Sequence, residues 1–80
     1  METKIAVLAV IVNDLSAVEQ VNSTLHDFGE FIIGRMGIPY REKGVNVISI
    51  VIDATQEVIN SLSGKIGMIK GVKSKVLTTK

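Results

Sequence analysis

The 80-residue sequence lacks cysteine and tryptophan, and it contains one histidine and one proline. Without cysteine the chain can form no disulfide, no thiolate metal site and no cysteine nucleophile. This composition is compatible with a reducing cytoplasm. The histidine, His26, lies near Asp27 and Glu30, but their spacing repeats no known ligand pattern. We therefore expect no metal site and no cofactor.

An excess of charge of one sign and a long apolar run are also missing. Nine basic and eight acidic residues give a net charge of +1. A domain that binds nucleic acid mainly through phosphates would be more basic. The apolar run from Ile5 to Val12 is far shorter than the roughly 20 residues that span a bilayer, and it lacks the flanks of a signal peptide. We expect a cytoplasmic protein that binds neither membrane nor nucleic acid directly.

The residues that are present alternate between strand and helix patterns. Residues 4–13, 30–36, 45–53 and 72–79 read as strands because they are rich in β-branched side chains. The apolar stripes of two helices follow the first and third strands: Val18, Val21, Leu25 and Phe28, then Val58, Ile59, Leu62 and Ile66. The order is βαββαβ. Right-handed crossovers then give an α+β, ferredoxin-like sandwich over residues 1–80, with an antiparallel sheet of order 4-1-3-2 and two helices on one face.

Polar residues, glycine and proline predict where these elements end. Ser16 followed by Glu19 fits a capping box at the start of the first helix, and Thr55 is a candidate N-cap of the second. Gly29 is placed where a helix would end in a left-handed residue. A glycine at position 34, inside a strand, predicts a bulge. Pro39, between two glycines, predicts a loop over residues 37–44 and lies outside every predicted strand and helix.

The two central strands carry apolar residues on both faces of the pleat. In the first strand, Ile5, Val7, Ala9 and Ile11 alternate with Ala6, Leu8, Val10 and Val12; in the third, Ile48, Ile50 and Ile52 alternate with Val47, Ser49 and Val51. Two helices can cover only one face, so several aliphatic side chains stay outside in either register. Burying each is worth about 1.5–3 kcal/mol. We predict a homo-oligomer, a dimer or tetramer, through the open face with Val47, Ser49 and Val51, and edge-strand pairing as a second contact.

Residue patterns typical of catalysis and of RNA recognition are missing. Asp14 and Asp53 end adjacent antiparallel strands, so they lie far apart and form no catalytic pair. No phosphate loop, dinucleotide fingerprint or activated serine occurs, and we expect no enzyme. The two central strands carry no aromatic residue on which RNA bases could stack. The segment over residues 35–44 is the one loop with an unusual set of polar side chains, namely Arg35, Tyr40, Arg41 and Lys43. These side chains could bind an anion or a partner protein. Alternatively, their charge only keeps a hairpin loop in solvent.

The segment from Ile33 to Asp53, with its Gly-Arg-Met-Gly-Ile-Pro-Tyr stretch, resembles the family of iron-only hydrogenase system regulators. The resemblance extends to Val21-Asn22, Leu25-His26 and residues 62–67, nearly the whole chain. It implies an ACT-like fold, related to the C-terminal domain of the nickel-responsive repressor, and an oligomer. ACT domains bind an amino acid near the first strand–helix loop, often at a glycine. Asn13 and Asp14 occupy this place, so they are candidate binding residues, although the loop has no glycine.

Two functions remain open at this point. The first is a regulatory or sensor module that self-associates, binds a small ligand at a subunit interface and belongs to the iron-only hydrogenase system. The second is a protein-interaction adaptor that uses the 35–44 loop and has no small-molecule ligand. The nickel-responsive relative uses several histidines and a cysteine, so the resemblance does not extend to nickel binding.

Overall fold

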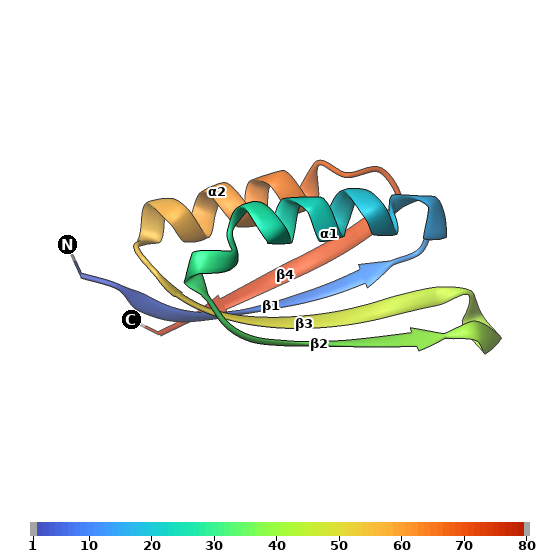
Figure 1. The fold of residues 1–80 in the computed structure, drawn as a ribbon, viewed down its shortest axis with the longest axis horizontal. Helices are drawn as coiled ribbons and strands as arrows, with labels where there is room; N and C mark the ends of the chain where they lie inside the picture. Colours follow the sequence, from blue (N-terminus) through green and yellow to red (C-terminus); the bar gives the residue numbers. More distant parts are fainter. Residues whose placement is uncertain (1, 80) are drawn as a thin grey trace.

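The computed structural model describes residues 2–79 and shows one sheet with two helices on one of its faces (Figure 1). The strands are β1 (Lys4–Val12), β2 (Ile32–Tyr40), β3 (Val45–Ala54) and β4 (Val72–Thr78). The helices are α1 (Val18–Asp27) and α2 (Gln56–Gly67), with short 3-10 turns at Leu15–Ala17, Gly29–Phe31 and Arg41–Lys43. The sheet order is β2-β3-β1-β4, and all pairs are antiparallel. The predicted ferredoxin-like fold and strand order are confirmed.

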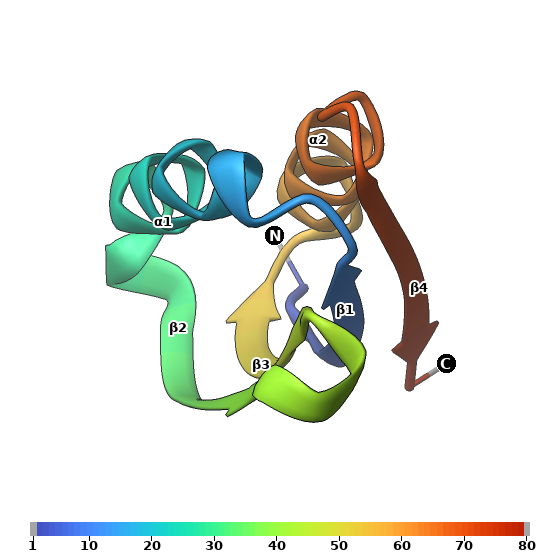
Figure 2. The ribbon, with the colours of Figure 1, turned by 90° about the vertical axis from the view of Figure 1, so that its right-hand side faces the viewer.

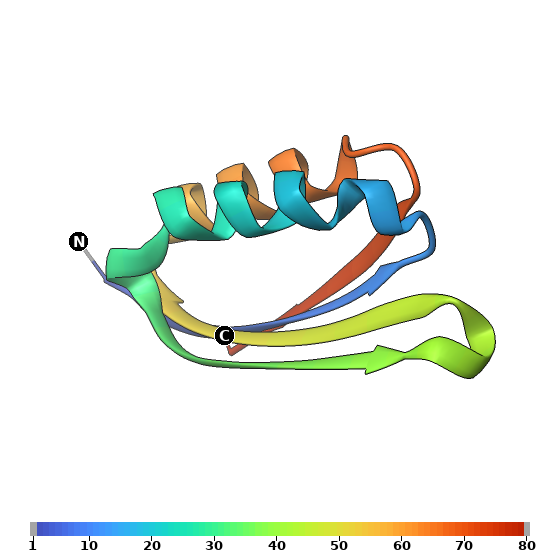
Figure 3. The ribbon, with the colours of Figure 1, turned by 45° about the vertical axis from the view of Figure 1, so that its right-hand side comes forward.

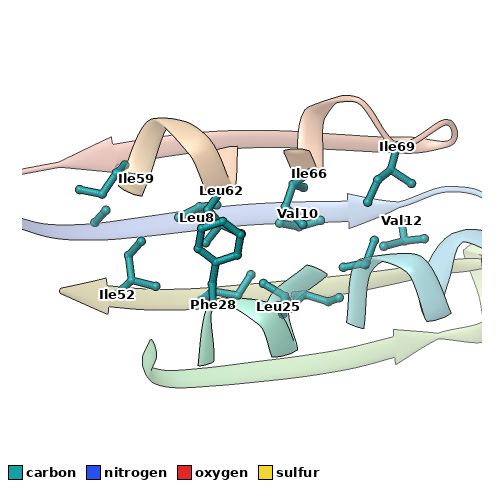
Figure 4. Close-up of a cluster of buried hydrophobic side chains, with 14 of the residues drawn as sticks. Leu8, Val10, Val12, Leu25, Phe28, Ile52, Ile59, Leu62, Ile66 and Ile69 are labelled. Atoms are coloured by element: carbon teal, nitrogen blue, oxygen red, sulfur yellow. The ribbon is translucent and has the colours of Figure 1, made fainter. Parts of the chain in front are cut away.

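The core lies between the sheet and the two helices (Figure 4). On β1 and β3 the buried positions are Ala6, Leu8, Val10, Val12, Ile48, Ile50, Ile52 and Ala54; α1 adds Val21 and Leu25, and α2 adds Ile59, Leu62 and Ile66. The structure therefore shows which of the two apolar faces of β1 is buried against the helices. Its even-numbered residues point to the helices, and its odd-numbered residues point away from them.

The hairpin between β2 and β3 differs from the prediction. The predicted loop over residues 37–44 is wrong, because β2 continues through Pro39 to Tyr40 and only residues 41–44 form the turn. Proline lacks an amide hydrogen, but β2 is an edge strand and needs to donate to one neighbour only, which makes Pro39 tolerable there. Gly44, with a φ of 66°, closes the turn. The hairpin projects beyond the helices as an arm (Figure 3).

The predicted glycine bulge and one of the predicted caps are confirmed. The β2–β3 register shifts between Ile32 and Gly34, as a bulge requires. The Thr55 hydroxyl accepts a hydrogen bond from the Val58 amide at 3.3 Å and caps α2. Both features depend on residues close in sequence, which explains why the sequence predicts them well.

Two other predicted helix ends are wrong. The capping box at Ser16 does not form, because the chain first makes a 3-10 turn that Asp14 caps, and α1 starts later, after Ala17. Gly29 is not left-handed; within residues 2–79, positive φ angles occur at Gly44 and Gly71 alone. Gly29 instead opens the second 3-10 turn, which leads directly into β2.

Gly64 in the interior of α2 provides a direct test of local helix stability. A Cβ atom added there meets no other atom within 4 Å. Glycine in a helix interior destabilises by about 0.5–1 kcal/mol relative to alanine because its unfolded backbone is freer. We expect Gly64→Ala to raise the free energy of unfolding by this amount in urea denaturation. A decrease would show that position 64 is crowded or strained.

Candidate functional site

The face of the sheet that points away from the helices (Figure 2), called here the open face, is rich in exposed aliphatic residues. On β1 it presents Ile5, Val7, Ala9 and Ile11. The side chains of Ile5, Val7 and Ile11 are each about 40% exposed. The register aligns them with Val47, Ser49 and Val51 of β3, with Met36, Ile38 and Tyr40 of β2, and with Leu77 of β4. These side chains form one continuous surface across all four strands.

Val47, Ser49 and Val51, which the sequence predicts as an oligomer contact, all lie on the open face. Val47 is exposed on the open face, and its neighbours Ser49 and Val51 are half-buried there. Strand spacings of about 4.8 Å and 3.3 Å per residue give this face a flat area of roughly 500 Å². This area includes the polar Ser49, Lys73 and Lys75. The largest apolar patch on a typical soluble monomer is about 300–600 Å² and is often functional.

The surface of the open face is hollowed near β4. Ala9 is shorter than the side chains beside it, and it lines a depression of about 480 Å³ with Ile11, Lys73, Ser74 and Lys75. The two lysines form the rim, because they are paired with Ile11 and Ala9 across the β1–β4 ladder. A bulky aliphatic side chain from a partner could fill this hollow while the lysine ammonium groups stay in water.

At the first strand–helix loop, the predicted binding residues are engaged in the fold itself. The Asp14 carboxylate accepts hydrogen bonds from the hydroxyl of Ser16 at 2.7 Å and from its amide at 3.0 Å. The Ser16 hydroxyl, then its amide, hold the pKa of Asp14 below its ordinary value of 3.8. The stabilisation this gives is therefore present above that value and is lost as the pH falls through the lowered pKa. The Asn13 and Asp14 amides both donate to the Gly71 carbonyl, at 2.7 and 3.2 Å.

The structure separates the four candidate residues of the 35–44 segment. Arg41 and Lys43 lie on the exposed turn at the tip of the arm. The Tyr40 hydroxyl donates to the Glu42 carboxylate at 3.1 Å, on the open-face side. Arg35 is paired with the buried Ile50, so it points to the helix side of the sheet. These side chains thus form no single cluster.

Arg35 instead lies in a groove between α1 and β2 that sequence reasoning missed. The groove has a volume of about 200 Å³ and is lined by Val18, Asn22, Arg35, Gly37, Ile38, Pro39, Asn46 and Ile48. The Arg35 guanidinium donates to the side-chain oxygen of Asn22 at 2.9 Å. Asn22 and Asn46 are far apart in the sequence, and neither stands in a recognisable motif. The one available signal was a strand whose helix-facing positions, Arg35, Gly37 and Pro39, are not aliphatic.

Within residues 2–79, no helix is long and apolar enough to cross a membrane. In the same part of the chain, no three histidine, cysteine or carboxylate residues gather as metal ligands would.

Comparisons with known proteins give one family and two informative structures. Residues 4–76 match the family model described as "TM1266-like: Iron-only hydrogenase system regulator, putative". The structure of uncharacterized protein TM1266 from Thermotoga maritima is 38% identical, with a TM-score of 0.93 over 99% of this chain and 100% of that one. A formyltetrahydrofolate deformylase from Pseudomonas putida KT2440 is 10% identical and shares the fold alone, with a TM-score of 0.65 over 91% of this chain and 28% of that one. No curated protein matches the chain.

Proposed function

The chain belongs to the TM1266-like family of iron-only hydrogenase system regulators, and from this membership we propose that it is a non-catalytic, cytoplasmic regulatory domain of that system. We further propose that it works as a homo-oligomer whose open faces pack against each other. The ferredoxin-like, ACT-like fold supplies the scaffold, since its helices leave one face of the sheet uncovered.

The observation that carries this proposal is the exposed aliphatic surface of the open face. Ile5, Val7, Ile11 and Val47 are each 38–43% exposed, and burial of the surface that remains exposed would contribute about 0.6–1.3 kcal/mol for each. An open face that meets its own copy across a twofold axis needs no second gene product, because a twofold interface uses the same patch on both subunits. Two such sheets would stack about 10 Å apart, as in other face-to-face sheet packings. The hollow over Ala9 gives such a partner a place to insert a side chain.

A gene deletion in the native host tests the regulatory part of the proposal. Deletion is expected to change iron-only hydrogenase activity or transcript level, and the wild-type gene is expected to restore it. A gene carrying Val47→Lys on the open face should fail to restore it while the protein accumulates normally. Hydrogenase activity and transcript that are unchanged by the deletion would contradict a regulatory role.

The shape of the arm supports a second candidate function, a protein-interaction adaptor. Arg41 and Lys43 are exposed at its tip, which projects beyond the helices (Figure 3). Cationic side chains on a projecting turn suit a partner with an acidic surface. Affinity capture from the native host with wild-type protein and with Arg41→Ala distinguishes this candidate. A specific partner that is lost with Arg41→Ala supports it, and a partner retained by both, or none, opposes it.

A further inference from the structure

The groove between α1 and β2 interrupts the packing between the sheet and its helices. Along β2, the positions that point to the helix side after Ile32 are Arg35, Gly37 and Pro39. Their neighbours on β3 include the buried Ile48 and Ile50. An ordinary sandwich would place aliphatic side chains at all of these positions. Departures of this kind from local packing rules often mark functional sites.

Gly37 keeps the groove open. It is paired with the buried Ile48, so a side chain at position 37 would point to the helix side of the sheet. A Cβ atom built there meets nothing within 4 Å, and its φ angle is not in the left-handed region. Neither backbone conformation nor crowding therefore requires glycine at this position. The missing side chain leaves space beside Arg35.

Polar groups from three different elements converge on this space. Arg35 on β2, Asn22 on α1 and Asn46 on β3 line it together with the apolar Val18 and Ile48. The hydrogen bond to Asn22 fixes the guanidinium through one of its five N–H groups and leaves others free. A concave site with an apolar floor and a few convergent polar groups is typical of small-molecule binding.

The positive charge of Arg35 favours an anionic ligand in the groove. Arginine presents a rigid pair of N–H donors that matches the two oxygens of a carboxylate. The carboxamides of Asn22 and Asn46 could each donate a further hydrogen bond to the same group. The volume of about 200 Å³ fits a small organic molecule rather than a peptide or a nucleotide.

An apolar extension adjoins the groove under the arm. A second hollow of about 210 Å³ is lined by Leu15, Pro39, Tyr40, Arg41, Gly44, Val45 and Asn46. It shares Pro39 and Asn46 with the groove, so the two are neighbours. Leu15 is 54% exposed at its edge and makes that edge apolar. A ligand anchored at Arg35 could extend an aliphatic tail along Pro39 towards Leu15.

We propose that the groove binds a short-chain aliphatic carboxylate, with its carboxylate on Arg35 and its tail along Pro39 towards Leu15. The site goes beyond the regulatory role proposed above, because it is formed within one subunit and on the helix side of the sheet. It would give each copy of the chain a metabolite-binding function that is separate from self-association through the open face.

Titration of the ¹⁵N-labelled protein with butyrate, followed by NMR, tests this site. We expect saturable shifts of the Asn22 side-chain amide, the Arg35 Nε and the Gly37 backbone amide. Butylammonium and 1-butanol, which lack the carboxylate, should not produce them. Hexanoate should bind more tightly than butyrate by roughly fourfold per added methylene if its tail is fully buried. The readout is the same in a monomer and in an oligomer, so its failure is distinguishable from failure of the self-association proposal.

Two variants and two controls sharpen the result. Arg35→Lys keeps the charge but loses the paired donors, and we expect it to weaken butyrate binding by about tenfold or more. Gly37→Val fills the groove and should abolish binding. Lys43→Gln on the tip of the arm and Gly34→Val on the opposite side of β2 should leave it unchanged. Absence of saturable shifts, equal shifts with 1-butanol, shifts centred on Arg41, or binding unaffected by Arg35→Lys would each overturn the proposal.

Discussion

Replacement of Val47 by lysine is expected to convert the proposed oligomer into a folded monomer. Val47 lies on the open face of the central strand β3, near the arm, and it is 38% exposed and outside the buried core. In the packed sheets, however, the variant loses the burial of one aliphatic side chain and must bury or displace a charge. The first effect concerns the 38% of Val47 that is exposed in the monomer and is worth about 0.6–1.1 kcal/mol in each subunit of a twofold pair. Because 1.4 kcal/mol is a factor of ten, and because the cost of the buried charge is added, we expect the dissociation constant to rise by at least about tenfold.

Sedimentation velocity measures this change, and Met68→Lys provides the matched control. Met68 is 86% exposed at the C-terminal end of α2, on the other side of the molecule from the open face. The same change from an apolar side chain to lysine at that position should leave the proposed oligomer intact. Far-UV circular dichroism should show that both variants keep the fold. An oligomer that tolerates Val47→Lys as well as it tolerates Met68→Lys would place the interface elsewhere.

Replacement of Gly71 by alanine is expected to cause a large loss of stability. Gly71 has a φ of 84°, a conformation that residues with a side chain rarely adopt. A Cβ atom there would clash with the Cβ atom of Asp14. The contact is tight because the Asn13 and Asp14 amides both donate to the Gly71 carbonyl. Backbone strain and the clash together should lower the free energy of unfolding by about 2–4 kcal/mol.

Urea denaturation of Gly71→Ala and Gly64→Ala side by side tests this contact. The two variants make the same chemical change, but they are expected to have opposite effects, a loss at position 71 and a gain at position 64. The contrast separates the effect of the tight contact between Gly71 and Asp14 from the general effect of replacing glycine by alanine. A loss below about 1 kcal/mol at position 71 would show that the junction relaxes at little cost.

The sequence predicts the fold well because its strongest signals are local and repeated. The alternation of β1 and β3 and the helical stripes each depend on a period of two or 3.6 residues, and they decide the core directly. The same alternation predicts that Val47, Ser49 and Val51 share a face. It could not decide which face meets the helices, because both are apolar. The structure decides it through residues far apart in the chain, such as Ile50 against Leu62 and Ile66 in one core.

The sequence predicts the arm and the groove poorly because both depend on strand position. Proline and two glycines over residues 37–44 favour a loop in isolation, but the edge strand tolerates Gly37 and Pro39, and Gly44 alone lies in the turn. Once β2 extends to Tyr40, the side chains of Arg35 and Tyr40 fall on opposite faces. The hydrogen bond between Arg35 and Asn22 then joins two elements 13 residues apart, and no local pattern predicts it.

The mass of the wild-type chain in solution tests the account most directly. Sedimentation equilibrium of the untagged protein at micromolar concentration should give at least twice the chain mass of 8.6 kDa. This mass would agree with the proposal that a second copy covers the exposed aliphatic residues of the open face. A single species of 8.6 kDa across the micromolar range would contradict self-association through this face.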